Sequence, residues 1–413
     1  MFSRDWLPIA ASQIVAVVCG LAGVHLTTRW VRPEEAGTYG LFLSLTPLGA
    51  MLTHAGLIKH FSRHWVGAPD RRSYLRVWLR ASLWASAVLL AGVLLAGAAR
   101  LIQPRTGWAV AALFIATSAG AYAQSFQLGV QSAARYWTDF GLTFFGSTTR
   151  TFVPLLAIWG TGAGVAALAG GYALHAVGFA GLAGVVVLRL SRNPVSGSAA
   201  GEQPASLRAY QMVFLFHGAL VLVNQGVVRW SASFAFDDAT LGYITLAANL
   251  AAVGPSLASG ALWQFSYPRL LAQKRDAGMG PMQRLADLTL ALYVLACLGG
   301  GLLLAGLLPL LPGTLVANAY LPALRFVLPL FSFYAGLCGL TLLQGELLVL
   351  DRPRAALRFA ALGTALLAGG TLAFALLSPA RLIAWWWYSF AAALLPLWIA
   401  LRRGWWIDRE ERT

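Results

Sequence analysis

The stretch RWVRPEEAGTYG, Arg29 to Gly40, decides the fold because it separates two long runs without formal charge. Before it, Leu7–Thr28 carries no Asp, Glu, Lys or Arg, and after its glutamates Ala36–Ile58 carries none either. About 20 apolar residues, rising 1.5 Å each, cross the hydrocarbon core of a bilayer. The stretch is therefore predicted to be a short connector between two membrane-spanning helices.

The composition of the whole chain agrees with this interpretation. Of 413 residues, 58% are hydrophobic and only 11% are charged, and the mean hydropathy is +0.68. A soluble globular domain carries about 25% charged residues. A membrane-spanning barrel would need polar residues alternating along its strands, whereas these runs are continuously apolar. The sequence predicts an all-α polytopic membrane protein.

The charge balance is strongly basic, with 30 Lys and Arg against 15 Asp and Glu. Basic residues crowd the cytoplasmic loops of membrane proteins, and no basic domain lies outside the apolar runs, so nucleic acid is not expected as a partner. The three cysteines fall inside predicted helices without metal-ligand or disulfide spacing. Neither a metal nor a cofactor is expected.

About twelve helices are predicted from the apolar runs and the turn signals between them. Their ranges are 7–28, 37–58, 79–99, 107–131, 140–160, 164–188, 209–231, 240–262, 287–311, 322–350, 357–377 and 382–401. If the N-terminus is cytoplasmic, 22 of the 30 basic residues lie on the cytoplasmic side and 7 on the outer side. This asymmetry predicts that both termini are cytoplasmic.

The chain is predicted to consist of two six-helix lobes. Ser191–Arg208 is rich in Ser, Gly, Ala and Pro, which is typical of a flexible linker. The lobes are expected at 1–190 and 209–401, joined by the linker 191–208 and followed by a cytoplasmic tail, 402–413. The stretch FAFDDATLGY, Phe234–Tyr243, repeats the acidic pair, the glycine and the tyrosine of the first connector. Such a repeat is typical of transporters built from two halves.

Several stretches together resemble the polysaccharide flippases (Wzx-like) of the MOP transporter superfamily. The first connector, Arg29 to Tyr39, is similar to the first outer loop of that family. The other similar stretches are His54–Leu57, Gln127–Phe140 (QLGVQSAARYWTDF), Asp238–Tyr243 and Asp351–Pro353. The resemblance extends over the whole chain in length, helix count and orientation.

This resemblance implies a fold of two lobes around a central cavity in the cell inner membrane. It implies transport of lipid-linked oligosaccharides, typically on undecaprenyl pyrophosphate, from the inner to the outer leaflet, with polysaccharide polymerase and chain-length machinery as candidate partners. One departure is Arg229, which lies in a region of helix 7 where many members carry an acidic residue.

Arg150 is the sharpest candidate for a functional residue. It lies about ten residues into its predicted helix, where an arginine costs roughly 3 kcal/mol and should face a cavity or a partner. The planar fork of arginine suits phosphate, so one interpretation is that Arg150 holds a phosphate of the lipid carrier. The other interpretations are a structural ion pair with a buried acid such as Asp139 or Glu346, or a helix register that places Arg150 nearer to water.

Further candidate substrate contacts are polar residues in other predicted helices. Gln124, Gln127 and Gln131 share one helix face, and this face meets either a sugar-binding cavity or another helix, where glutamine bonds between helices. Arg229 lies about 30 Å along its helix, close enough to the outer surface to extend its guanidinium into water.

Four residues are candidates for gating or coupling. Arg29, Glu34 and Glu35 in the first connector are expected either to close an outer gate or simply to lie at the wet interface around the turn. Glu346 lies within an apolar run, where it is expected either to titrate or to pair with Arg352 or Arg354.

Three other functional classes compete with the flippase, and one of them is a scaffold without transport activity. A multidrug antiporter of the same superfamily is the alternative, but an exporter of organic cations needs buried carboxylates and this chain has few. A membrane glycosyltransferase or polymerase would usually carry a long outer loop or an Asp-x-Asp motif, and the sequence has neither. The chain is therefore not expected to be an enzyme.

Overall fold

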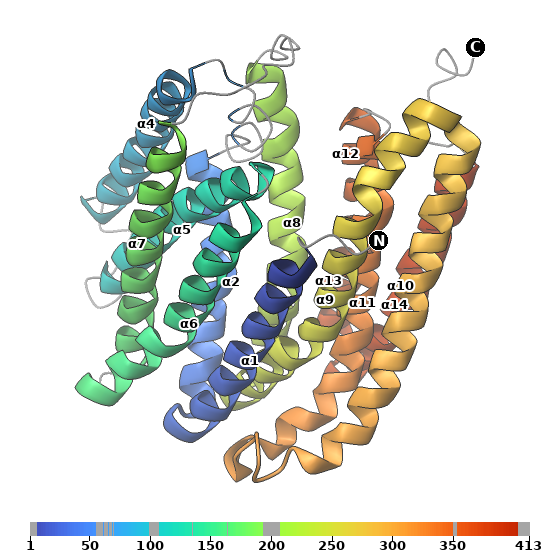
Figure 1. Cartoon of the computed structure of the whole chain (residues 1–413). Helices are drawn as coiled ribbons and strands as arrows, with labels where there is room; N and C mark the ends of the chain where they lie inside the picture. The colour runs from blue at the N-terminus through green and yellow to red at the C-terminus, as the bar shows by residue number, and fades with distance from the viewer. Residues whose placement is uncertain are drawn as a thin grey trace. The chain divides into compact units, whose positions relative to one another are not determined.

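The computed structural model describes residues 6–54, 61, 65, 68, 70–98, 107–133, 135–162, 164–192, 207–349 and 353–403. These residues fold into long helices joined by short turns (Figure 1). The chain divides into two compact units, one formed by Met1–Val31 and Phe42–Leu222 and the other by Arg32–Leu41 and Val223–Thr413. The predicted linker at 191–208 stays a prediction, since residues 193–206 lie outside the described residues.

The first unit contains the helices of the N-terminal half. They are α1 (Trp6–Trp30), most of α2 (Pro33–His54), α4 (Arg71–Ala98), α5 (Gly107–Ser132), α6 (Tyr136–Thr161), α7 (Gly164–Leu190) and the first part of α8 (Leu207–Ala235).

The second unit contains the beginning of α2, the rest of α8 and the helices that follow. These are α9 (Asp238–Ala277), α10 (Met279–Leu307), α11 (Leu324–Val349), α12 (Pro353–Thr364), α13 (Gly370–Leu377) and α14 (Pro379–Arg402). Two 3₁₀ turns, η2 (Leu308–Leu310) and η3 (Asn318–Ala323), join α10 to α11, and a π-helical turn, η4 (Ala365–Gly369), joins α12 to α13.

The predicted helix pattern is confirmed. Because α12, η4 and α13 are continuous, the described residues contain one helix for each of the twelve predicted. By length and apolarity alone, seven helical segments of the described part qualify as membrane spans. The largest boundary error is at α9, predicted to end at 262 but continuing to Ala277. Its last turns are rich in good helix formers, and the helix ends only before Gly278, at φ 84°.

In the first unit, α7 packs against both α5 and α6, and α6 also packs against α1 (Figure 1). Small residues allow the closest contacts: a Cβ added to Gly171 of α7 would lie 2.6 Å from the Cα of Pro154 in α6. Close approach of backbones at small residues is the usual way in which membrane helices pack.

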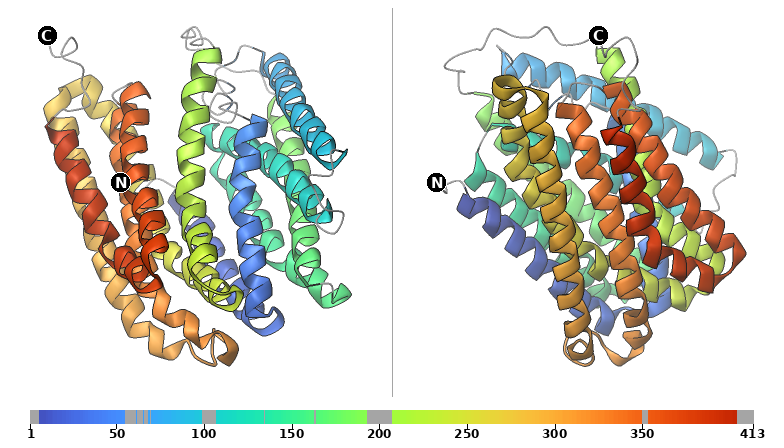
Figure 2. Two further views of the ribbon diagram at one scale, coloured as in Figure 1. Left: turned by 180° about the vertical axis from the view of Figure 1, so that it is seen from behind. Right: turned by 90° about the vertical axis from the view of Figure 1, so that its right-hand side faces the viewer.

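In the second unit, α11 is the central helix, packed against α9 and α14, while α10 packs against α9 and α11 (Figure 2). The side chains of Phe326, Leu330 and Phe333 on α11 are fully buried. A Cβ on Gly336 would lie 3.2 Å from the Cα of Phe390 in α14, so here too a glycine brings two backbones together.

The two copies of the acidic–glycine motif contact each other in the second unit. A Cβ on Gly37 in α2 would lie 2.9 Å from the carbonyl oxygen of Asp238 and 3.0 Å from the amide nitrogen of Gly242 in α9. A Cβ on Gly242 would in turn collide with the carbonyl group of Pro33. The first turns of α2 and α9 therefore cross at backbone-to-backbone contact, which only glycine permits.

We expect Gly242→Ala to destabilise the protein, because the added methyl group must push α2 away from α9. Overpacking of this kind costs about 1–3 kcal/mol. The matched control is Gly120→Ala in the middle of α5, where an added Cβ meets no atom within 4 Å and the better helix propensity of alanine is slightly stabilising. Thermal unfolding of the purified protein in detergent measures both, and equal melting temperatures would contradict the close contact.

Candidate functional site

Arg150 lies near the middle of α6 with an exposed side chain. Its neighbours anchor the helix on two sides. The hydroxyl of Thr151 donates to the carbonyl oxygen of Cys19 in α1 (3.3 Å), and the hydroxyl of Thr149 lies 2.8 Å from Nδ1 of His175 in α7. Because Thr149 donates its single proton to the carbonyl oxygen of Phe145 (2.7 Å), Nδ1 of His175 must be the donor. Arg150 projects from the remaining side of α6.

Both acidic partners considered for Arg150 make other contacts among the described residues. Asp139 is bound by glutamine amides and Glu346 by another arginine. Within the part of the chain that the structure describes, no hydrogen bond or ion pair engages the guanidinium group. Arg150 is thus an exposed cation, halfway along a helix, whose hydrogen-bonding capacity is open to a ligand.

Two of the three predicted glutamines meet at Asp139 in the first turn of α6. Nε2 of Gln127 donates to Oδ1 of Asp139 (3.0 Å) and to the hydroxyl of Thr143 (3.0 Å). Nε2 of Gln131 donates to both carboxylate oxygens, at 3.1 and 3.0 Å. The amides of α5 therefore bond to another helix, one of the two outcomes expected from the sequence, and their carbonyl oxygens remain as acceptors.

The carboxylate of Asp139 has no basic partner among the described residues. It shares a face of α6 with Thr143 and Arg150, because the positions follow a spacing of i, i+4 and i+11. Gln124, on the same face of α5 as the other two glutamines, is exposed, and no hydrogen bond engages it among the described residues. From the sequence, Asp139 was considered only as a partner for Arg150. The missed signal was the pair of amide side chains, Gln127 and Gln131, near the end of the preceding helix.

Arg229 lies in the second unit, six residues before the end of α8. Its Nη2 donates to Oδ1 of Asn249 in α9 (2.9 Å), while its buried Nε has no hydrogen-bond partner among the described residues. The guanidinium group is therefore only partly satisfied by the protein. Arg229 and Arg150 belong to different units.

The charged residues of the first connector make the contacts of a helix start. Pro33 is the first residue of α2, and Oε2 of Glu35 accepts from the backbone N–H of Arg32 (3.4 Å), as in one half of a capping box. Glu34 lies in the same first turn, where negative charge is favourable. Arg29 bonds through Nη1 to Nδ1 of His25 on its own helix (3.0 Å). These contacts explain the residues structurally, and their gating role stays a prediction.

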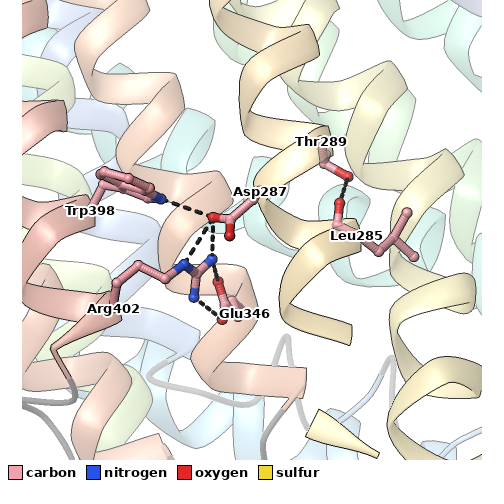
Figure 3. Close-up of polar contacts among 6 residues, drawn as sticks. All are labelled: Leu285, Asp287, Thr289, Glu346, Trp398 and Arg402. Carbon is pink, nitrogen blue, oxygen red and sulfur yellow. Dashed lines mark hydrogen bonds and ion pairs between the residues drawn. The ribbon is translucent and has the colours of Figure 1, made fainter. Parts of the chain in front are cut away.

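Glu346 is buried in an ion-pair network with Arg402 and Asp287 (Figure 3). Arg402 binds the carboxylate of Glu346 with two parallel bonds, Nη1 to Oε1 at 2.6 Å and Nη2 to Oε2 at 2.9 Å. It also binds Oδ1 of Asp287 through Nε (2.8 Å), and Nε1 of Trp398 donates to the same oxygen (2.9 Å). The network joins α10, α11 and α14.

Among the described side chains, the partner of Glu346 is thus Arg402. The alternative pairing with Arg352 or Arg354 stays a prediction, because the side chain of Arg354 is not among those that the structure describes. Arg352 lies outside the described residues. The sequence predicted that Arg402 begins the cytoplasmic tail. In the structure Arg402 is the last residue of α14. The available signal was the opposite charge of Glu346, near the end of the tenth predicted helix, and Arg402, just after the twelfth.

A small cavity of about 20 Å³ lies next to Glu346. Its polar lining comes from Ser266, Thr289 and Glu346. The hydroxyl of Ser266 is buried and has no hydrogen-bond partner in the part of the chain that the structure describes. A cavity needs roughly 10–15 Å³ and two to four polar partners to hold a water molecule. This one meets both conditions, so a bound water would satisfy Ser266 and reach the carboxylate.

We expect Arg402→Ala to destabilise the protein far more than Glu346→Gln. Removing the arginine leaves Glu346 as an uncompensated buried charge, which costs about 3–5 kcal/mol. In Glu346→Gln the arginine keeps its bonds to Asp287. The control is Arg403→Ala, the next residue, which is exposed. Thermal unfolding in detergent provides the ranking, and equal melting temperatures for the Arg402 and Arg403 variants would exclude a structural role for the network.

The fold is similar to solved structures of membrane transporters. A multidrug resistance MATE family transporter of the MOP superfamily, in an inward-facing conformation, matches with a TM-score of 0.62 and 13% identity over 98% of this chain and 100% of that one. The lipid II flippase MurJ, in an inward closed conformation, matches with a TM-score of 0.63 and 11% identity over 96% and 87%. The Vibrio cholerae MATE transporter VcmN matches with a TM-score of 0.59 and 12% identity over 99% and 97%.

No protein-family profile matches the chain, and no curated protein matches its sequence. The structural similarity at this level of identity shows the fold, so the chain is a multi-pass membrane protein with the fold of MOP-superfamily transporters. That fold encompasses both MATE transporters and the lipid II flippase.

Proposed function

We propose that this protein transports an undecaprenyl-pyrophosphate-linked oligosaccharide from the inner to the outer leaflet of the cell inner membrane. The observation that carries the proposal is Arg150, an exposed guanidinium halfway along a helix, whose expected acidic partners are both engaged elsewhere. An arginine at bilayer depth is costly and is retained where it faces a partner or an aqueous pathway. A pyrophosphate supplies the charge and the paired oxygen acceptors that suit its fork.

The glutamine face of α5 would contact the sugar. The amide N–H groups of Gln127 and Gln131 donate to Asp139, so their side-chain carbonyl oxygens would accept hydrogen bonds from sugar hydroxyl groups. Gln124 would bind the sugar through both its carbonyl oxygen and its amide N–H groups. The predicted contact of Arg229 with the substrate stays a prediction, supported by a guanidinium group that the protein satisfies only in part among the described residues. In this scheme Arg29, Glu34 and Glu35 act at the outer gate, and Glu346 takes part in coupling. Both termini are cytoplasmic. Polymerase or chain-length machinery receives the exported oligosaccharide.

The test is a flipping assay in proteoliposomes with a radiolabelled undecaprenyl-pyrophosphate oligosaccharide. We expect Arg150→Ala to slow transport by about 10- to 100-fold, the loss of one hydrogen-bonded charged contact, and Arg150→Lys to keep part of the rate. Arg192→Ala, which removes an exposed arginine beyond α7, is the control. Full transport by a normally folded Arg150→Ala variant would refute the phosphate-binding role.

A multidrug antiporter is the second candidate, and Asp139 is the observation that favours it. An organic cation needs a carboxylate that is not already paired with a basic residue, and Asp139 meets this condition among the described residues. Under this alternative, proteoliposomes would exchange a fluorescent cation such as ethidium, and Asp139→Asn would abolish the exchange while Asp139→Glu kept part of it. Ethidium exchange without lipid flipping would favour the antiporter over the flippase.

A further inference from the structure

One face of α4 carries an arginine ladder, formed by Arg72, Arg76 and Arg80. The spacing of i, i+4 and i+8 places the three side chains on one side of the helix, and all three are exposed. Asp70 begins the helix by accepting from the backbone N–H groups of Arg72 and Ser73, at 2.9 and 3.0 Å. No ion pair or hydrogen bond engages the three guanidinium groups among the described residues.

The same face becomes apolar immediately after the ladder. Leu83, Trp84 and Leu90 follow it on this side of α4, and Trp84 and Leu83 are 75% and 59% exposed. The opposite side packs into the first unit through Leu75 and Trp78, each 3% exposed. An outward face that turns from cationic to apolar within one turn, with a tryptophan at the change, marks the boundary between headgroups and acyl chains.

The dimensions of the ladder agree with this boundary. From Arg72 to Arg80 the helix rises about 12 Å. The headgroup layer on each side of the hydrocarbon core is about 5–7 Å thick, and an arginine stem extends along apolar surface to bring its charge into that layer. All three guanidinium groups can therefore reach the phosphate level of one leaflet while Leu83 and Leu90 contact acyl chains.

We propose that the arginine ladder of α4 is a binding site for the phosphate headgroups of anionic phospholipids. The continuity of the ladder with the lipid-facing apolar side chains favours a lipid over a soluble anion, because one molecule contacts both parts. Arginine binds phosphate with two parallel hydrogen bonds, and basic residues next to a membrane span recognise anionic lipids. The site is independent of the transported substrate.

The test is the affinity of the full-length protein in detergent for fluorescent phosphatidylglycerol, measured by fluorescence anisotropy. Each arginine near a membrane surface contributes about fivefold in affinity, so Arg72→Gln, Arg76→Gln and Arg80→Gln combined should weaken binding by about a hundredfold. The single variant Arg76→Gln should weaken phosphatidylglycerol binding by about fivefold. This variant tests the proposal even if the triple variant does not fold. Raising the salt concentration should weaken binding by the wild type.

The matched control removes the same charge elsewhere. Arg189, Arg192 and Arg284 are exposed arginines that the charge asymmetry places on the same side of the membrane, but they form no ladder. Their combined replacement by glutamine should leave the affinity within a few-fold of the wild type. An equal loss in both triple variants would reduce the effect to net charge, and competition by inorganic phosphate at the same concentration as the lipid would show a soluble-anion site instead. Either result overturns the proposal.

Discussion

The cost of placing an unpaired charge in hydrocarbon constrains the whole molecule. A charge at bilayer depth must find a partner, a ligand or water, and three internal charges among the described residues show different outcomes of this constraint. Glu346 is neutralised by Arg402, which also binds Asp287. Asp139 is solvated by two amides in place of water. Arg150 is left with its capacity open, and this contrast, not its position alone, makes it the centre of a proposed site.

The helix pattern could be predicted from the sequence because each spanning helix needs about 20 apolar residues, and the charges fall between the runs. The predicted helix boundaries were wrong where polar residues suggested the end of a membrane span but helix propensity favoured a longer helix. Residues 263–277 of α9 are polar enough to end a membrane span, yet they remain helical, because helix formation depends on backbone hydrogen bonds and good helix formers. The apolar runs indicate where lipid is, and they do not indicate where a helix ends.

The side-chain partners were less predictable, because pairing depends on which helices are neighbours. Glu346 and Arg402 are 56 residues apart in the sequence, and nothing local links them. Gln127 and Gln131 were recognised as one face, but only the packing of α5 against α6 identifies Asp139 as what that face binds. Arg150 was the opposite case, because its isolation in an apolar run singled it out directly as a candidate, and the structure shows other contacts for both acids considered as its partners.

The contact of Gly37 with Gly242 has a consequence for the order of assembly. Residues 32–41 belong to the second unit, so the segment that completes this unit leaves the ribosome about 200 residues before α9, against which it packs. At about 5–20 residues per second, synthesis of that interval takes about 10–40 s. During this time the first turn of α2 lacks its neighbour, and the charged connector must wait at the membrane surface. Burial of two glutamates in hydrocarbon is costly, so Glu34 and Glu35 disfavour entry of the unfinished contact site into the bilayer until the second half of the chain arrives.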